Sequence, residues 1–161
     1  MLNKYLKLAL NSEKGQSLLE LALTLPLLLA LASGLVTLGL AYYEYNTLSK
    51  SVREAARYMS SNEWDPAYQT TCQKMAVYGN TGGTGSPILP SMTISNINIR
   101  GRTEAGSLSA FNTFSKTTPP DWVTVNVAGY TFTGRIFGMI PLSISFTPSV
   151  EMRYVGLNAK T

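Results

Sequence analysis

The sequence predicts an α+β protein in which a long N-terminal helix packs on a small antiparallel sheet of about three strands. The first observation is an uncharged run of 23 residues, Leu21–Tyr43, that is long and apolar enough to be helical throughout. The second is an apolar stripe at helical spacing over residues 46–59. The third is a C-terminal half in which β-branched and aromatic residues alternate with polar ones, as they do in half-buried strands.

The uncharged run predicts a single crossing of a membrane. At about 1.5 Å per residue it forms roughly 35 Å of helix, enough for the ~30 Å hydrocarbon core of a bilayer. Before it, the three lysines Lys4, Lys7 and Lys14 outweigh Glu13, and an excess of lysine holds a segment in the cytoplasm. Membrane lipid is therefore the first partner that the sequence predicts.

These observations divide the chain into three parts. Residues 1–15 are predicted to be a cytoplasmic leader, residues 16–45 a transmembrane helix, and residues 46–161 an extracytoplasmic α+β domain. Three tyrosines, Tyr42, Tyr43 and Tyr45, lie where the helix is expected to meet the outer headgroups, which suits an aromatic belt.

Three residues inside the apolar run predict helix shape and packing. Pro26 removes one backbone hydrogen bond and is expected to kink the helix. Gly34 and Gly39, with the other small residues around Gly34, form a face that allows close approach of a second helix in lipid. Small residues are also common in membrane helices without such a role, and the sequence does not decide between the two interpretations.

Glu20 stands at the front edge of the run, five residues after Gly15. A charged side chain costs about 2.5–3.5 kcal/mol at the centre of a membrane helix and less near its end. We therefore expect the Glu20 carboxylate either to pair with a cation or to have a function. Residues 14–20, Lys-Gly-Gln-Ser-Leu-Leu-Glu, resemble the class III leader of type IV pilin-like proteins. The resemblance implies cleavage by a prepilin peptidase between Gly15 and Gln16, which makes Glu20 the fifth mature residue.

The cut would free an ammonium group at Gln16, about 6 Å along the helix from Glu20. In filaments of such proteins the glutamate is thought to meet the N-terminus of a neighbouring subunit. A buried ion pair of this kind adds little net stability but can fix register.

Within that group the sequence is most similar to TadE-like minor pilins of tight-adherence systems. The similarity rests on residues 20–29, Glu-Leu-Ala-Leu-Thr-Leu-Pro-Leu-Leu-Leu, on residues 53–58, Arg-Glu-Ala-Ala-Arg-Tyr, and more loosely on Val123–Val127 and Met152-Arg153. Leu21 departs from the pattern, because an aromatic residue is common there. The resemblance implies a non-catalytic pseudopilin of the bacterial inner membrane, possible entry into a surface pilus, and three partners: prepilin peptidase, other pilin or pseudopilin subunits, and an inner-membrane assembly-platform protein.

Two other interpretations of the N-terminus stay open. An ordinary signal anchor would leave Glu20 incidental, and the chain would then be an unprocessed accessory protein of a secretion system that binds a partner through its outer domain. A secretory signal peptide is the second, because Ala30-Leu31-Ala32 matches an A-x-A cleavage site. Against it, the apolar run continues eleven residues beyond Ala32.

The outer domain begins with the stripe of Leu48, Val52, Ala55, Ala56 and Met59, which is expected to cover the chain's own sheet. Asp65-Pro66 predicts the start of a short helix over residues 66–78, and Gly79 its end. Residues 80–87 are predicted to be a flexible loop.

Strands are predicted at residues 92–100, with a bulge or a late start, and at residues 123–127, and a bulge is expected at Gly129. The piece from Gly134 to Pro141 is predicted to be turns. A strand with strict period-two alternation then follows from Ser143 to Tyr154.

Residues 101–121 are predicted to be a surface loop in which Phe111 and Phe114 either anchor to the domain or meet a partner.

Composition argues against several classes of function. The chain has no histidine, the commonest general base and metal ligand, and it shows no catalytic pairing, so we expect no enzyme, cofactor or metal site. The leader supplies two of the four net positive charges, and no basic patch is interleaved with aromatic residues, so we expect no nucleic acid partner. The single cysteine, Cys72, is expected to be a free, partly buried thiol rather than an interchain disulfide.

Overall fold

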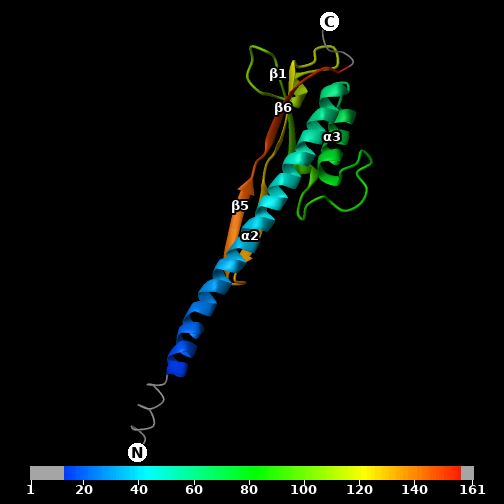
Figure 1. Cartoon of the computed structure of the whole chain (residues 1–161). Helices are drawn as coiled ribbons and strands as arrows, with labels where there is room; N and C mark the ends of the chain where they lie inside the picture. Colours follow the sequence, from blue (N-terminus) through cyan, green and yellow to red (C-terminus); the bar gives the residue numbers. More distant parts are fainter. Residues whose placement is uncertain (1–12, 157–161) are drawn as a thin grey trace, which may run out of the picture. The chain divides into compact units, whose positions relative to one another are not determined.

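The computed structural model describes residues 13–156 and confirms an α+β fold with a long N-terminal helix and an antiparallel sheet (Figure 1). Leader residues 1–12 lie outside the described part. The elements in chain order are α2 (Glu13–Ser61), α3 (Pro66–Tyr78), the 3₁₀ turn η1 (Ile94–Asn96), β1 (Ile97–Arg102), β2 (Ser109–Ala110), the 3₁₀ turn η2 (Phe111–Thr113), β3 (Trp122–Val127), β4 (Tyr130–Ile136), β5 (Ile140–Phe146) and β6 (Ser149–Arg153).

The chain forms two compact units. The first contains the described residues up to Leu40 together with Gly134–Leu142, and the second contains Ala41–Thr133 and the residues from Ser143 onward. Helix α2 runs through both units without a break, and Pro26 lies inside it. Proline is tolerated there because its ring removes only one hydrogen bond of a long ladder.

The sheet of the second unit has four strands in the order β2-β1-β3-β6, all antiparallel. At its centre Ile99 faces Val125, which in turn faces Val150, so one apolar row crosses three strands. Strands β4 and β5 form a separate two-stranded sheet.

Helix α2 covers this sheet with the predicted stripe. The side chains of Leu48, Val52, Ala55, Ala56 and Met59 are fully buried and share one core with Val123, Val125 and Val127 of β3. Arg53 and Arg57 lie on the exposed side of the same turns. The amphipathic pattern alone thus predicts both the covering helix and its orientation.

Helix α3 has the predicted boundaries, residues 66–78. The Asp65 carboxylate accepts a hydrogen bond from the Ala67 amide at 2.8 Å, Pro66 occupies the first turn, and Gly79 ends the helix at φ 71° with its amide bonded to the Met75 carbonyl. A left-handed residue at this position favours glycine because it has no Cβ.

Residues 101–121 are more ordered than a surface loop. They hold the end of β1, all of β2, and Phe111, which is buried and stacks on Trp64 with ring centroids 4.5 Å apart. The Trp64 indole N–H also donates to the Phe111 carbonyl at 3.1 Å. Phe114 packs so closely over β1 that a Cβ on Gly101 would meet its ring at 2.6 Å. Both phenylalanines therefore anchor the segment to the domain.

The strand predicted at residues 92–100 has the late start that was expected: β1 begins at Ile97, after the 3₁₀ turn. Two other predictions are corrected. The piece from Gly134 to Pro141 is not a run of turns: β4 extends to Ile136 and β5 begins at Ile140. Gly129, at φ 74°, separates β3 from β4 instead of forming a bulge within one strand.

The period-two segment from Ser143 to Tyr154 is also two strands, β5 and β6, in different sheets. Pro148 lies at the break, where its missing N–H would interrupt a ladder, while its carbonyl accepts from the Val127 amide at 3.0 Å. The alternation of apolar and polar residues shows which face of a strand is buried. It does not show which other strand that strand pairs with.

Cys72 is a free thiol with no exposed surface, and its Sγ lies 3.1 Å from the Ala55 carbonyl oxygen of α2. It is therefore more deeply buried than the sequence suggested. Burial raises the pKa of this thiol to about 12, because the thiolate would lose its hydration.

Replacing Leu48 by alanine should destabilise the second unit by about 2–5 kcal/mol, because it leaves a cavity between helix and sheet. Urea unfolding of the full chain in detergent, followed by tryptophan fluorescence, measures this loss. Arg57→Ala is the matched control: its side chain is exposed on the same helix, and it should change stability little. Equal losses in both variants would contradict the assignment of the buried stripe.

The Cys72 thiol should react with a disulfide reagent at pH 8 only after unfolding. Stability should also fall as pH rises above the ordinary thiol pKa of 9.0, since the unfolded state then releases a proton that the folded state keeps up to about pH 12. Urea midpoints at pH 8 and pH 10 for wild type and Cys72→Ala isolate this contribution. A pH dependence of the same size in both proteins would refute it.

Candidate functional site

The predicted cleavage position lies in the first turns of α2. Gly15 and Gln16 are both helical and exposed in the described structure. Glycine is about 1 kcal/mol less favourable than alanine inside a helix, so a glycine near its start lowers the cost of opening that turn. The peptide bond between them is therefore sterically accessible and locally easy to unwind.

Glu20 is exposed on the same helix, one turn after Gln16. Among residues 13–156, none forms a hydrogen bond or ion pair with its carboxylate. The structure thus leaves this carboxylate available to a group from outside the described chain.

Around Glu20 the helix surface is almost entirely aliphatic. Helix α2 is long and apolar enough to cross a membrane, and only 6% of its most apolar window is buried within the chain. The exposed large side chains are Leu18, Leu19, Leu21, Leu23, Leu25, Leu27, Leu28, Leu29, Leu31, Leu35, Val36, Leu38 and Leu40. A soluble helix buries its apolar stripe, so a helix that exposes leucine all round is suited to a single-pass membrane anchor.

Part of the predicted small-residue face lies against the chain's own β4–β5 hairpin, within the first unit. The Ser33 hydroxyl accepts a hydrogen bond from the Phe137 amide at 2.6 Å, and the Thr37 hydroxyl donates to the Arg135 carbonyl at 3.1 Å. A Cβ on Gly34 would lie 4.0 Å from Ile136, whereas Gly39 faces open space. Packing of Gly39, or of the kink residue Pro26, against a second protein stays a prediction.

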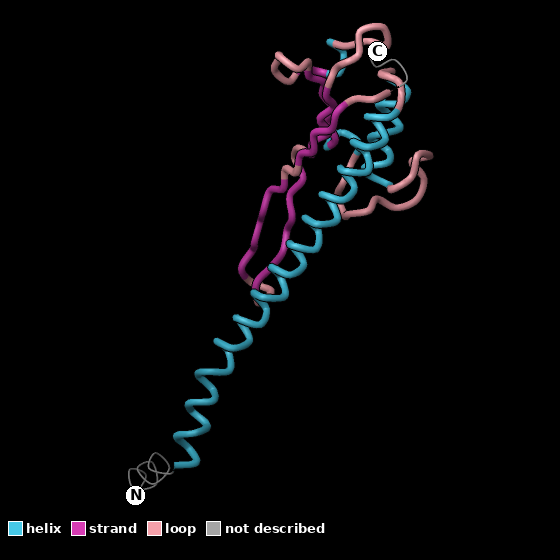
Figure 2. The backbone as a smooth tube through the Cα atoms, turned by 45° about the horizontal axis from the view of Figure 1, so that its top comes forward, coloured by secondary structure: helices cyan, strands magenta, loops and turns pink. Residues whose placement is uncertain are grey.

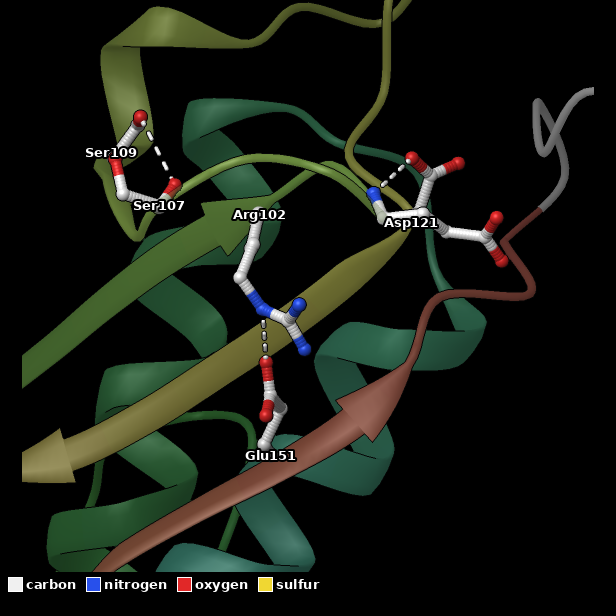
Figure 3. A network of polar contacts seen from close by, with 6 residues as sticks. Arg102, Ser107, Ser109, Asp121 and Glu151 are labelled. Carbon is white, nitrogen blue, oxygen red and sulfur yellow. Dashed lines mark hydrogen bonds and ion pairs between the residues drawn. The ribbon is translucent and has the colours of Figure 1, made fainter.

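Two carboxylates at the end of the sheet in the second unit, those of Glu151 and Asp121, have structural partners (Figure 3). The Arg102 guanidinium, which lies over the Trp122 ring, donates to Glu151 at 2.8 Å and ties β1 to β6 across β3. The Asp121 carboxylate accepts from the Glu104 amide at 3.0 Å, which holds the start of the 103–108 loop. These contacts stabilise the sheet edge and do not form a reactive pair.

Another polar contact, which sequence analysis missed, joins α2 to β4. The Tyr130 hydroxyl donates to the Glu44 carboxylate at 2.7 Å, at the end of the apolar run. Burial and this bond both raise the tyrosine pKa, because its charged form would be desolvated and would repel the glutamate. The only signal in the sequence was a lone glutamate between tyrosines, and no local pattern predicts a partner 86 positions away.

Within residues 13–156 no group of three or more cysteine and acidic side chains is placed to hold a metal ion. Two shallow hollows of about 300 Å³ lie in the second unit, one lined by Lys50, Glu54 and Met75 and the other by Gln73, Arg100 and Phe111. The first hollow is also lined by Thr47 and Ser51, whose hydroxyls donate to the Tyr43 and Leu48 carbonyls within α2.

The sequence model of the family described as TadE-like protein matches residues 15–57 of this chain. The match begins at the glycine of the predicted cleavage site and ends within the buried stripe of α2. It confirms the resemblance to TadE-like proteins over the helix, and it does not extend over the strands. No curated protein and no solved structure matches the chain significantly.

Proposed function

We propose that this chain is a membrane-anchored minor pilin or pseudopilin of a tight-adherence pilus or secretion apparatus, and that it acts structurally, without catalysis. The observation that carries the proposal is that the TadE-like match coincides with a helix whose leucines are exposed all round. Such a helix requires lipid or neighbouring helices as its surroundings, and a filament subunit uses both in turn.

The orientation follows from charge. Lys4, Lys7 and Lys14 precede the apolar run, so the N-terminus stays in the cytoplasm and the α+β domain lies outside the bacterial inner membrane. The exposed arginines on the outer side of α2 occur only after the run. Prepilin peptidase then acts at the cytoplasmic face, at the accessible bond between Gly15 and Gln16.

Cleavage gives the carboxylate of Glu20 a function. The new ammonium group at Gln16 of one subunit pairs with Glu20 of the next, and the pairing fixes the axial register of adjacent helices. The absence of a described partner for Glu20 within its own chain supports this role.

The helix supplies lateral packing to other pilin subunits and to the inner-membrane assembly platform. The second unit, in which the carboxylates of Glu44, Asp121 and Glu151 hold the fold, presents surfaces outside the membrane.

Replacing Gly15 by tryptophan should leave the leader attached, because a bulky side chain obstructs the close approach of the peptidase to the backbone. The intact mass and N-terminal peptide of the protein from its native membrane measure this. Wild type should start at Gln16 and Gly15→Trp at Met1, with Leu18→Trp as a control that keeps the cut. A wild-type start at Met1 would favour the unprocessed accessory protein instead.

Replacing Glu20 by alanine should leave cleavage intact but strongly reduce incorporation into sheared filaments, since the register pair is lost. Glu20→Asp, which keeps the charge, should restore part of the incorporation. Immunoblotting of filament and membrane fractions separates assembly from processing. If Glu20→Ala entered filaments as well as wild type, the proposal that Glu20 fixes the register of adjacent helices would be wrong.

A further inference from the structure

The β4–β5 hairpin ends in an apolar tip that nothing in the described chain covers. Phe137, Met139 and Ile140 are 42%, 74% and 61% exposed. The exposed side chains of β4 before Gly134 are threonines, and those of β5 after Leu142 are serines. The exposed side chains of the hairpin are therefore hydroxyl-bearing along its strands and apolar at its tip. Arg135, which is exposed, lies where the two regions meet.

The tip is held against the most apolar part of α2. Two hydrogen bonds join it to Ser33 and Thr37, and a Cβ on Gly34 would lie 4.0 Å from Ile136 (Figure 2 shows the loop end of this hairpin beside the helix). The neighbouring helix positions Leu35, Val36 and Leu38 are exposed. Tip and helix thus both expose apolar side chains within the first unit.

The backbone of the tip carries an unfavourable residue. Phe137 and Gly138 have φ of 54° and 70°, and the Met139 amide bonds to the Ile136 carbonyl at 3.2 Å, which defines a tight turn with two left-handed positions. Such turns favour Asn-Gly, whereas a bulky residue at a left-handed position is strained. An exposed aromatic side chain at a position that disfavours it indicates a use for the ring.

The hairpin also limits how deep this part of α2 can lie. If residues 21–43 filled the hydrocarbon core, Ser33 would stand near its midplane, with the hairpin beside it. An open sheet edge has unpaired amides and carbonyls, which hydrocarbon does not tolerate. Ser33 must therefore lie close to the outer edge of the core.

We infer that the hairpin tip inserts into the outer headgroup layer of the membrane beside its own anchor helix. Phe137, Met139 and Ile140 contact the upper acyl chains, and the Arg135 guanidinium reaches the lipid phosphates. Counting about 20 residues back from Ser33 places the inner edge of the core near Lys14, the last cation before the run. Glu20 then lies within the hydrocarbon core, where an unpaired carboxylate is most costly and a cationic partner would stabilise it most.

This inference rests on the membrane anchor but not on cleavage or filament assembly. It moves the outer end of the spanning segment from the predicted residue 45 to about residue 33–37. Leu40 and the tyrosines after it then stand outside the hydrocarbon, where they can meet other subunits.

The test uses the full chain in vesicles of phosphatidylethanolamine and phosphatidylglycerol, at high lipid-to-protein ratio. Met139→Cys carries an environment-sensitive fluorophore, and Cys72 stays unlabelled because it is buried. Lipids with a quencher at shallow or deep acyl positions report depth. Leu28→Cys marks the core, and Glu104→Cys, on an exposed loop, marks the aqueous phase.

We expect blue-shifted emission at Met139 and strongest quenching by the shallow lipid, at a depth of about 5–10 Å. An aqueous spectrum like that of Glu104, or quenching as deep as that of Leu28, would overturn the inference. A blue shift that appears only when the protein is crowded would mean that a second copy covers the tip, and would overturn it also. An aqueous spectrum at Leu28 would show that α2 does not enter the bilayer, and would contradict the membrane anchor in the proposed function as well.

Two variants test the aromatic ring without disturbing the turn. Phe137→Asn suits the left-handed position and should keep the hairpin folded while it reduces shallow quenching at Met139. Phe137→Trp should keep the quenching, because tryptophan favours the interface. Unchanged quenching in Phe137→Asn would contradict the role of the ring and with it the inserted tip.

Discussion

One helix must satisfy two different environments, and the rest of the structure depends on how α2 does so. A helix bonds all its interior amides and carbonyls internally, so it can expose leucine to lipid over one length and pack on a sheet over another without a break. From Leu48 onward its apolar side chains narrow to one buried stripe, and arginines occupy the other side. That stripe supplies the second face of a core that a four-stranded sheet cannot form alone.

The small residues in the middle of α2 allow the β4–β5 hairpin to pack against the helix. Ser33, Gly34 and Thr37 leave room for the hairpin backbone, and two of them provide hydroxyls that bond to it. The bond from Thr37 to the Arg135 carbonyl is partly buried, and a polar group that is removed from water without a partner costs free energy. The small-residue face, for which the sequence left open a role in packing against a second helix, thus partly contacts a strand pair of the same chain.

Local patterns in the sequence predicted those elements whose determinants are local. The N-cap at Asp65, the left-handed end at Gly79 and the stripe of α2 each lie within a few residues, and each was found in the structure. The split of β5 from β6 was missed, because pairing depends on distant strands and the alternation continues through Pro148. The Glu44–Tyr130 bond and the Trp64–Phe111 stack were missed for the same reason: their partners are tens of residues apart. Gly15, Gln16 and Glu20 were identified through the resemblance to a class III leader, and their chemistry stays a prediction because their proposed partners are other proteins.

The carboxylates of the described chain differ in whether they have a partner within it. In the second unit the carboxylates of Glu44, Asp121 and Glu151 are engaged by a tyrosine, a backbone amide and an arginine that hold the fold. Among residues 13–156 Glu20 has no such contact, although a charge among leucines is the most costly of the four. In the function proposed above, the cation that meets this carboxylate comes from another subunit. The exposed side chains around it are aliphatic, and such a surface suits lipid or a neighbouring helix.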